Sequence, residues 1–316
     1  EGDDVNFVQY TPGSSIGWIA GGRTPGSSPP GTGIDQVETF SLTSDGNATD
    51  VGAELTSGVV YTDTGKGPTY TYTVGGTSVD GPGASYYDSI QAMAIASPYG
   101  MTDWGESTQQ WLDHYSCMDG TYVWNCGGQQ GPAYTDSDTI DKFQTSSAAN
   151  STDVGESTQA RGGQTSVTDS MGGNGFITSS SNPPHDTTRI EYFSLTSDGN
   201  GTDTTDELTN IQNSGSGWSI SGSGFVAAGR YPQNINKFGF SSPYSGTDVG
   251  ETNAQHGYAG SPGAASSTHG YNAGGHISSG SSIGDAIDKN ALTSPYAATD
   301  VGEISHALSA AGSTAT

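Results

Sequence analysis

Residues 235–251, INKFGFSSPYSGTDVGE, belong to a stretch that occurs six times along the chain with variations. In each copy a Val or Ile stands 13 positions before the aspartate of a Thr-Asp pair. The copies open at Val37, Ile90, Ile140, Ile190, Ile235 and Ile287, and their aspartates are Asp50, Asp103, Asp153, Asp203, Asp248 and Asp300. Successive aspartates lie 53, 50, 50, 45 and 52 residues apart. A period near 50 residues is typical of propellers and repeat arrays.

A second feature recurs with the same period, a short aromatic or apolar strand that ends in a diglycine. Clear copies are GWIAGG at 17–22, YTYTVGG at 70–76, YVWNCGG at 122–128 and GYNAGG at 270–275. Degraded copies occupy 175–180 and 224–229. Each unit is therefore expected to contain a glycine strand, a loop, a strand that opens with Val or Ile, a turn, a strand after Thr-Asp, and a fourth strand.

In the strand at residues 235–240, apolar side chains occupy both odd and even positions and therefore point to both faces of the sheet. Ile235 faces one side, whereas Phe238 and Phe240 face the other. A half-buried strand keeps its apolar residues on one side, so this sheet is expected to be covered on both faces. The blades of a propeller are packed in that way. We therefore predict an all-β, six-bladed β-propeller with four-stranded antiparallel blades, and we place the glycine strands at its crowded centre.

The repeats are predicted to form one domain, residues 1–316, because stacked units share one continuous core. The repeat boundaries are expected near 17–68, 69–120, 121–173, 174–222, 223–268 and 269–316, with 1–16 as a closing strand or linker. Residues 306–316 and 5–11 are expected to give outer strands to one shared closing blade. Without an initiator Met or a signal peptide, the chain has the appearance of a processed product or an excerpt.

Composition limits the classes of partner. The formal net charge is −25, with only eight Lys and Arg. Nucleic-acid binding needs clustered basic residues, and an anionic membrane surface attracts them too, so neither partner is expected. No window approaches 18 apolar residues, and membrane insertion is therefore not expected.

The loops that follow the glycine strands vary most. Ile235 lies six positions after Gly229, whereas Val37 lies 15 positions after Gly22. In a four-stranded blade these loops share one face, and the constant turns before Thr-Asp share the other. A rigid scaffold with variable loops suits binding, and tyrosines beside carboxylates suit carbohydrate; the alternative is plain solvated loops. The candidate binding residues are Tyr86, Tyr87, Tyr134, His185, Arg189, Tyr231 and His276.

Catalytic and metal-binding patterns are mostly missing. A catalytic group is expected in one unit only, whereas a residue present in all six units is expected to be structural. The repeated aspartates are therefore not candidate catalytic residues. The main departure from the repeat is Asp113-His114, with three tryptophans nearby. An Asp-His pair could orient a base, but no second histidine has ligand spacing and there is no G-x-S-x-G. Packing of a Trp-rich strand on a neighbour is the preferred interpretation, and no enzyme activity or catalytic residue is predicted.

Calcium is the alternative to a structural role for the turn at residues 45–50. Asp45, Asn47, Thr49 and Asp50 alternate oxygen ligands, but the loop lacks the glycine and the terminal glutamate of a calcium loop. We therefore predict no cofactor and expect Thr-Asp to bond local backbone amides.

Two further features leave alternatives open. Cys117 and Cys126 flank a turn and are either bonded across neighbouring strands or free. Three N-x-T sequons at Asn47, Asn150 and Asn200 occupy one repeat position, where asparagine is either a glycan acceptor or a turn residue.

The diglycine strands with this period resemble kelch repeats, which also occur in galactose oxidase. More specifically, IDKFxFxS, TDVGE and STHGYxAGG (residues 235–251 and 267–275) resemble kelch-like repeat proteins of marine bacteriophages, especially cyanophages. The similarity extends over nearly the whole chain from Gly17. No residue set in this chain matches the copper-oxidase centre, so no catalytic residues are carried over.

The resemblance implies a non-enzymatic virion component of tail, fibre or appendage type, exposed outside the cell. Its expected partners are a host-surface carbohydrate or receptor, other virion proteins, and other copies of itself in a homo-oligomer. The alternatives are a purely architectural module that docks to other virion chains, and a secreted carbohydrate-active enzyme.

Overall fold

The computed structural model describes residues 15–23, 33–78, 83–169, 171–180, 187–212, 214–227, 229, 233–253, 256, 263–275, 283–307 and 312–315, the last four by their backbone only. These residues contain strands and no helix. They form six antiparallel four-stranded sheets and one three-stranded sheet. The all-β prediction is therefore confirmed.

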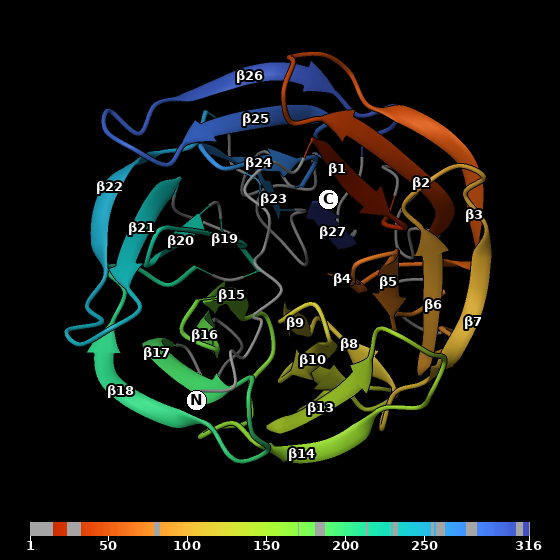
Figure 1. Ribbon diagram of the computed structural model, residues 1–316, viewed down its shortest axis with the longest axis horizontal. Helices are drawn as coiled ribbons and strands as arrows, with labels where there is room; N and C mark the ends of the chain where they lie inside the picture. The colour runs from red at the N-terminus through yellow and green to blue at the C-terminus, as the bar shows by residue number, and fades with distance from the viewer. Residues whose placement is uncertain are drawn as a thin grey trace, which may run out of the picture.

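Figure 1 labels the strands, and each four-stranded sheet is described from its innermost strand outwards. Sheet 1 contains β27 (Gly312–Ala315), β1 (Ile16–Ala20), β2 (Ile34–Ser41) and β3 (Thr49–Val59). Sheet 2 contains β4 (Asp63–Lys66), β5 (Tyr70–Val74), β6 (Ser89–Ala94) and β7 (Met101–Glu106). Sheet 3 contains β9 (Tyr115–Met118), β10 (Tyr122–Cys126), β13 (Thr139–Gln144) and β14 (Thr152–Glu156).

The other three four-stranded sheets follow the same order. Sheet 4 contains β15 (Thr165–Asp169), β16 (Asn174–Ser180), β17 (Thr187–Ser194) and β18 (Thr202–Glu207). Sheet 5 contains β19 (Ser216–Ile220), β20 (Ser223–Ala227), β21 (Asn234–Gly239) and β22 (Thr247–Glu251). Sheet 6 contains β23 (Gly263–Ala265), β24 (His269–Ala273), β25 (Ala286–Ala291) and β26 (Ala298–Glu303). The small sheet contains β8 (Trp111–Leu112), β11 (Gln129–Gln130) and β12 (Thr135–Asp136).

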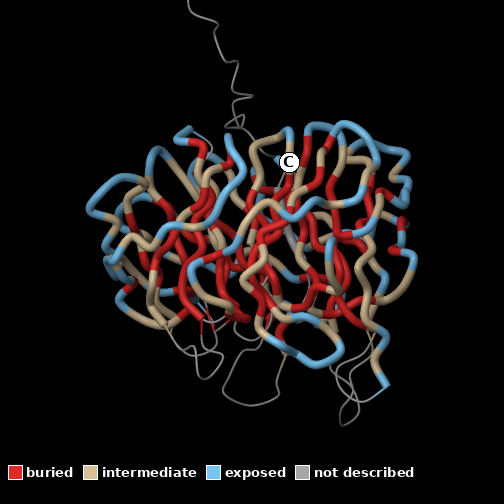
Figure 2. The backbone as a smooth tube through the Cα atoms, turned by 90° about the horizontal axis from the view of Figure 1, so that it is seen from below, coloured by how far each residue is buried: buried red, intermediate tan, exposed pale blue. Residues whose placement is uncertain are grey.

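The four-stranded sheets follow one another around a common centre (Figure 1). Their innermost strands β27, β4, β9, β15, β19 and β23 contact one another in that cyclic order. Six clusters of buried side chains fill the spaces between neighbouring sheets, one for each pair from sheets 1 and 2 round to sheets 6 and 1. Seen from the side, the buried residues occupy the middle of the molecule (Figure 2).

The third strand of each of sheets 1 to 5 contributes to two of these clusters. Ile235 of β21 packs in the cluster between sheets 5 and 6, whereas Phe238 packs between sheets 4 and 5. Burial on both faces was predicted from the parity of these residues, and that prediction is confirmed. Full burial of such side chains contributes about 1.5–3 kcal/mol each, so most of the apolar stabilisation lies between the sheets.

The predicted place of the glycine strands is wrong. They are second from the centre, and the strand that precedes each of them is innermost. The glycines of these strands make room for an aromatic side chain on the neighbouring strand of the same sheet. Gly224, for example, lies directly opposite Phe238. A Cβ at Gly224 would lie 2.5 Å from that phenyl ring. The diglycine that ends the strand has another cause, since Gly274 and Gly275 both have positive φ, 68° and 87°.

A repeated polar contact, which we call the clasp, joins each sheet to the preceding one. Its acceptor is the polar residue directly after the Val or Ile that opens each repeat, and it is buried in all six sheets. Its donors come from the crossover that leaves the outer strand of the preceding sheet, except that Gln91 accepts from Thr56 near the end of β3 itself. For example, the backbone N and Oγ1 of Thr108 donate to Asp141 Oδ2 over 3.0 and 2.7 Å. The acceptors are Glu38, Gln91, Asp141, Glu191, Asn236 and Asp288.

The outer strands are linked in a second way. The side chain of Asn150 accepts a hydrogen bond from the backbone N of Glu106 in the preceding sheet, and Asn200 and Asn47 do the same for Glu156 and Glu303. The repeated aspartates bond their own strand, as expected. Asp50 accepts from the backbone N of Gly52 over 2.7 Å, and Asp153, Asp203, Asp248 and Asp300 make the equivalent bond.

Sheet 1 combines segments that are far apart in the sequence. Strand β27 pairs with β1 and supplies the innermost strand. The prediction that residues 306–316 give an outer strand is therefore wrong, because β2 and β3 already occupy the outer positions. Residues 5–11, predicted as the companion strand, and all but two residues of the predicted linker 1–16 lie outside the described residues.

We predict that Gly224→Ala lowers the free energy of unfolding by about 1–3 kcal/mol, because the new methyl group overlaps the Phe238 ring. Urea unfolding would measure this change. Gly100→Ala is the control, since a Cβ at Gly100 meets no atom within 4 Å, and it should change stability by no more than about 0.5 kcal/mol. Equal stability of the two variants would contradict the packing argument.

Candidate binding face

Two kinds of connection meet on one face of the ring of sheets, which we call the loop face. They are the loops between second and third strands and the crossovers between successive sheets. Backbone bonds join them: Gly76 N donates to Trp111 O over 2.8 Å, and Gly128 N donates to Arg161 O over 2.9 Å. The turns before the Thr-Asp pairs lie on the opposite face, which we call the turn face.

The loop face carries a small folded layer of its own. In the small sheet, β11 pairs with β8 of a crossover on one side and with β12 on the other. The preceding unit has a less regular version, in which Thr77 bridges both Val60 and Tyr86. Such pairing fixes the loops of sheets 2 and 3 against the crossovers beneath them.

Two of the predicted binding residues meet in this layer. The rings of Tyr86 and Tyr134 lie edge to face, with centroids 5.8 Å apart and planes at 80°. Tyr134 is 37% exposed, and among the described residues Met171, on the turn face, is the only other large apolar side chain that is exposed. The structure therefore forms a tyrosine pair from two repeats whose loops are unrelated in sequence.

Of the other predicted residues, the two that the structure describes do not join this pair. Tyr87 packs against the cluster between sheets 1 and 2, so its ring belongs to the core. Arg189 lies on β17 and forms an ion pair with Asp203, at 3.4 Å. His185, Tyr231 and His276 lie outside the described residues.

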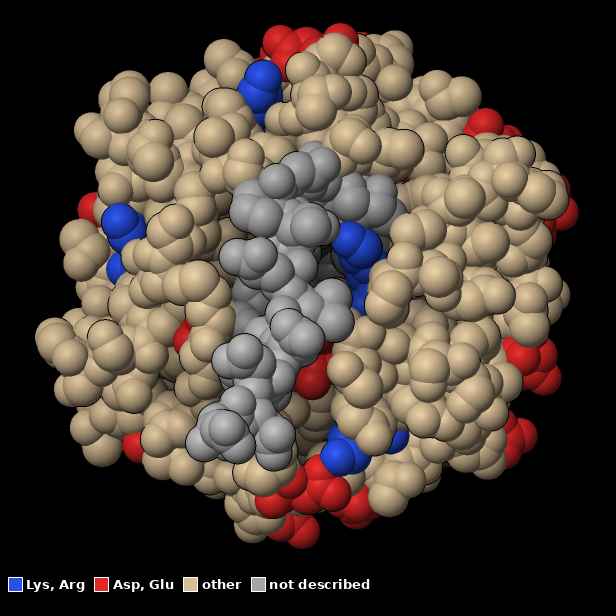
Figure 3. All heavy atoms as spheres, viewed as in Figure 1, with Lys and Arg blue, Asp and Glu red and all other residues tan. Residues whose placement is uncertain are grey.

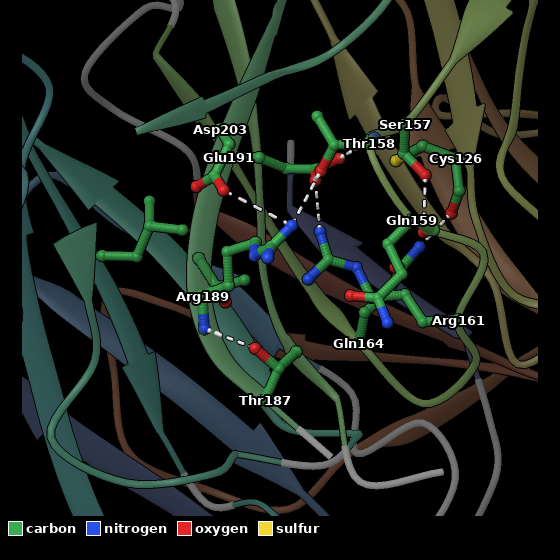
Figure 4. Close-up of polar contacts among 12 residues, drawn as sticks. Cys126, Ser157, Thr158, Gln159, Arg161, Gln164, Thr187, Arg189, Glu191 and Asp203 are labelled. Carbon is green, nitrogen blue, oxygen red and sulfur yellow. Dashed lines mark hydrogen bonds and ion pairs between the residues drawn. The ribbon is translucent and has the colours of Figure 1, made fainter. Parts of the chain in front are cut away.

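Arg189 belongs to a polar network that sequence reasoning missed (Figure 4). The buried guanidinium of Arg161, from the crossover between sheets 3 and 4, lies 2.7 Å from Glu191 Oε2. Arg189 Nη1 donates to Thr158 Oγ1 over 3.3 Å, and Thr158 donates to Glu191 in the clasp. Both guanidinium groups therefore lie at one clasp, and Arg161 is the cation that pairs with its buried carboxylate.

A positional signal for Arg161 exists in the sequence. Arg161 stands three residues after the clasp donor Thr158, as Trp111 does after Thr108 and His256 does after Asn253. Trp111 Nε1 and His256 Nε2 also bond the clasp carboxylate, over 3.2 Å to Asp141 and 2.8 Å to Asp288. This position varies among Val, Trp, Arg, Gln and His, so a search for identical residues overlooks it.

The Asp113-His114 pair does not form a catalytic dyad. Asp113 Oδ1 accepts a bond from Ser214 Oγ over 3.3 Å, and burial raises the pKa of Asp113 to about 6, helped by nearby Asp136. Burial lowers the pKa of His114 to about 3, and its ring packs 5.5 Å from Trp111. The packing interpretation of this segment is therefore the one that the contacts support.

The candidate calcium loop distributes its oxygens among different partners. Asp45 Oδ1 pairs with Lys289 Nζ at 3.0 Å, and Asn47 and Asp50 bond backbone amides. Throughout the described part of the chain, no group of three or more His, Cys, Asp or Glu is placed to hold a metal ion. Nor does that part contain a helix with the length and apolar character needed to cross a membrane.

The two cysteines are free and buried on neighbouring strands, β9 and β10. Cys126 Sγ donates to Tyr115 O over 3.0 Å. The sequon asparagines, Asn47, Asn150 and Asn200, are exposed, and each uses its side-chain oxygen to link two sheets.

Charge is unevenly distributed between edge and centre. In the view of Figure 3, acidic side chains lie mainly around the outer edge and basic side chains are few. The outer strands carry the repeated Thr-Asp aspartates, which agrees with this view. No protein-family model matches the chain, and no curated protein is similar to it in sequence.

We predict that Arg161→Val lowers the free energy of unfolding by about 3–5 kcal/mol, because it leaves Glu191 buried without its cation. Adding Glu191→Gln should restore most of the loss, since glutamine still accepts from Thr158 and carries no charge. The double variant reproduces the residues of the clasp between sheets 1 and 2. There Gln91 is the acceptor, and Val59 stands three residues after the donor Thr56, as Arg161 does after Thr158.

Urea unfolding of the three proteins would measure these changes. Arg189→Val is the control, because this partly exposed ion pair should contribute no more than about 1 kcal/mol. If the single and double variants were equally unstable, the charge of Glu191 would not be the cause.

Stability should also depend on Asp63. Burial raises the pKa of Asp63 to about 7, against hydrogen bonds from Thr64 and Ser116 that lower it. An unfolded aspartate ionises near pH 4, so stability present below that pH is lost as pH rises to about 7. Asp63→Asn should therefore stabilise the protein at pH 8, by about 1–3 kcal/mol, and change little at pH 4.

Urea unfolding at several pH values would check this. The matched control is Asp35→Asn, which removes the same charge from an exposed position on β2. A pH profile of Asp63→Asn that runs parallel to the wild-type profile would refute the role given to Asp63.

Proposed function

We propose that the chain is a six-bladed, kelch-like β-propeller that binds carbohydrate through its loop face, without catalysing a reaction. The cyclic packing of six sheets supports the architecture, and the small sheet is then an addition to the loops of one blade. The repeated diglycine strands and the TDVGE segments support the kelch-like assignment.

The tyrosine pair is the observation that carries the binding proposal. Two aromatic rings from different repeats lie together on the loop face, where rigid aromatic surface is typical of ligand sites. The turn face also carries a pair of tyrosines, Tyr192 and Tyr244, with ring centroids 5.9 Å apart. Both are only partly exposed and pack against the cluster between sheets 4 and 5, whereas Tyr134 is exposed. Loop-face binding is therefore favoured over turn-face binding.

The sequence resemblance adds the biological setting to the proposal. A virion protein of tail, fibre or appendage type would meet the host surface outside the cell, where carbohydrate is abundant. The acidic outer edge keeps such a particle soluble through repulsion. Repeated copies in a homo-oligomer would add avidity to a weak single site.

A second candidate is an architectural module that docks to other virion chains. The outer strands favour it, because β3, β7, β14, β18, β22 and β26 each form the last strand of their sheet. An edge strand can pair with a strand of another chain. Their carboxylates oppose such pairing with an acidic partner, so docking would require a basic one.

The binding proposal predicts that changes confined to the loop face weaken retention on polysaccharide. Residues 24–32 and 79–82, both in loops between second and third strands, would be replaced by Gly-Ser sequence of equal length. Retention on an array of purified polysaccharides should fall about tenfold or more, equivalent to about 1.4 kcal/mol. Met171→Ser on the turn face is the control and should bind like the wild type.

Failure of the wild-type protein to bind any polysaccharide would overturn the carbohydrate proposal. Equal binding by the loop-face variant and the control would place the site elsewhere on the molecule.

A further inference from the structure

The tyrosine pair allows the ligand class to be narrowed, in an inference that rests on the proposed carbohydrate binding. Tyr134 is the last residue of the turn between β11 and β12 and is held with φ of 52°, in the left-handed region. Its ring is partly exposed, whereas Tyr86 is less exposed and supports it edge-on. One ring is therefore presented and the other holds it in place.

The support of Tyr134 is built from several elements. The Tyr86 ring lies on the backbone of Gly131, where a Cβ would come within 2.3 Å of it. Gly131 N donates to Gln110 O over 3.0 Å, and Gln110 Nε2 donates to Tyr86 O over 3.2 Å. Gln129 Nε2 donates to Tyr134 O over 3.4 Å. Residues of two loops and one crossover thus fix the ring before any ligand arrives, which lowers the entropic cost of binding.

The surroundings of Tyr134 are polar and carry negative charge. Asp136 is two residues away on β12 and accepts from Gln129 Nε2 over 3.3 Å. Asp113, at the adjacent crossover, lies close enough to interact with Asp136 electrostatically. An aromatic ring beside carboxylate and amide groups can stack on the C–H face of a sugar and bond its hydroxyl groups.

Two described arginines of sheets 3 and 4 and their crossover are paired with acids. Arg161 pairs with Glu191, and Arg189 pairs with Asp203. A carboxylated or sulfated sugar at Tyr134 would therefore meet Asp136 and Asp113 while both of these arginines are already paired, on a chain of net charge −25. Like charges brought together at a binding surface reduce affinity for the wrong partner.

We propose that Tyr134, supported by Tyr86, is the stacking residue of a subsite for an uncharged saccharide ring. Asp136 and Gln129 supply the polar edge of this subsite. Glycans of neutral hexoses are the preferred ligands, and polymers of uronic acids or sulfated sugars are excluded by charge.

The test measures equilibrium binding of the full chain to a neutral glucan, a neutral galactan and a polyuronate of similar length. Wild type, Tyr134→Ala, Tyr134→Phe and the turn-face control Met171→Ala are compared at about 0.15 M salt. Tyr134→Ala should weaken binding to the neutral polymer about tenfold or more, as expected for an exposed aromatic anchor. Tyr134→Phe keeps the ring and should stay within about threefold of wild type, and Met171→Ala should bind like wild type.

The polyuronate should bind at least about tenfold more weakly than the best neutral polymer, and lower salt should widen this difference because screening decreases. Thermal unfolding of each variant establishes that it is folded. As a measurement without mutation, nitration of Tyr134 in wild-type protein should slow when the neutral polymer is bound.

The outcomes separate the two proposals. If wild type binds neutral polymer but Tyr134→Ala binds equally well and nitration is unaffected, the subsite is wrong and loop-face binding survives. If the polyuronate binds as tightly as the neutral polymers, the charge argument is wrong. If wild type binds no polysaccharide of either kind, the proposed function fails together with the subsite.

Discussion

The clasp is the contact on which the arrangement of the sheets depends. Apolar clusters hold neighbouring sheets together, but hydrophobic contact is non-directional and leaves their relative position loosely specified. The clasp adds direction, because acceptors such as Asp141 bond a backbone amide and a side-chain donor of one residue at a fixed place after the Thr-Asp pair of the preceding sheet. An unmade bond at such a buried acceptor costs about 1–3 kcal/mol. Each sheet is thereby held in one register relative to its neighbour, and the cyclic order follows from repetition of this single contact.

The same contact explains why the two faces differ. The crossovers are tied down by the clasp, and the turns before the Thr-Asp pairs are tied down by asparagines such as Asn150. The loops between second and third strands are attached to the crossovers at their diglycines, as at Gly76 and Gly128. Beyond these points their length and sequence differ from one sheet to the next. The small sheet and the tyrosine pair arise where two of these loops fold over the crossovers. Variation is therefore concentrated where the scaffold does not depend on it.

The sequence predicted the parts of the fold that repetition and parity encode. The repeat period predicted six units. The positions of Ile235 and Phe238 predicted a sheet covered on both faces, and each residue packs in a different cluster. Radial order could not be read in this way, because the innermost strands, such as β4 and β19, have no common motif. Of the site, Tyr86 and Tyr134 were predicted from their place in the variable loops, beside carboxylates, but their contact depends on loop pairing that no local pattern reveals. Tyr87, one residue from Tyr86, faces the core instead, and Arg161 was missed because its position holds a different residue in every unit.

The pairing of β27 with β1 has a consequence for how the protein forms during synthesis. Sheets 2 to 5 are each built from segments close together in the sequence, so their hairpins can assemble soon after they emerge from the ribosome. Sheet 1 has to wait, since Gly17 pairs with Ala315, nearly three hundred residues later. Until then the inner edge of β1 is an unpaired template that can capture a strand of a neighbouring nascent chain. Polysomes, where many copies are made side by side, are therefore the setting in which strand exchange between molecules is the main competing outcome.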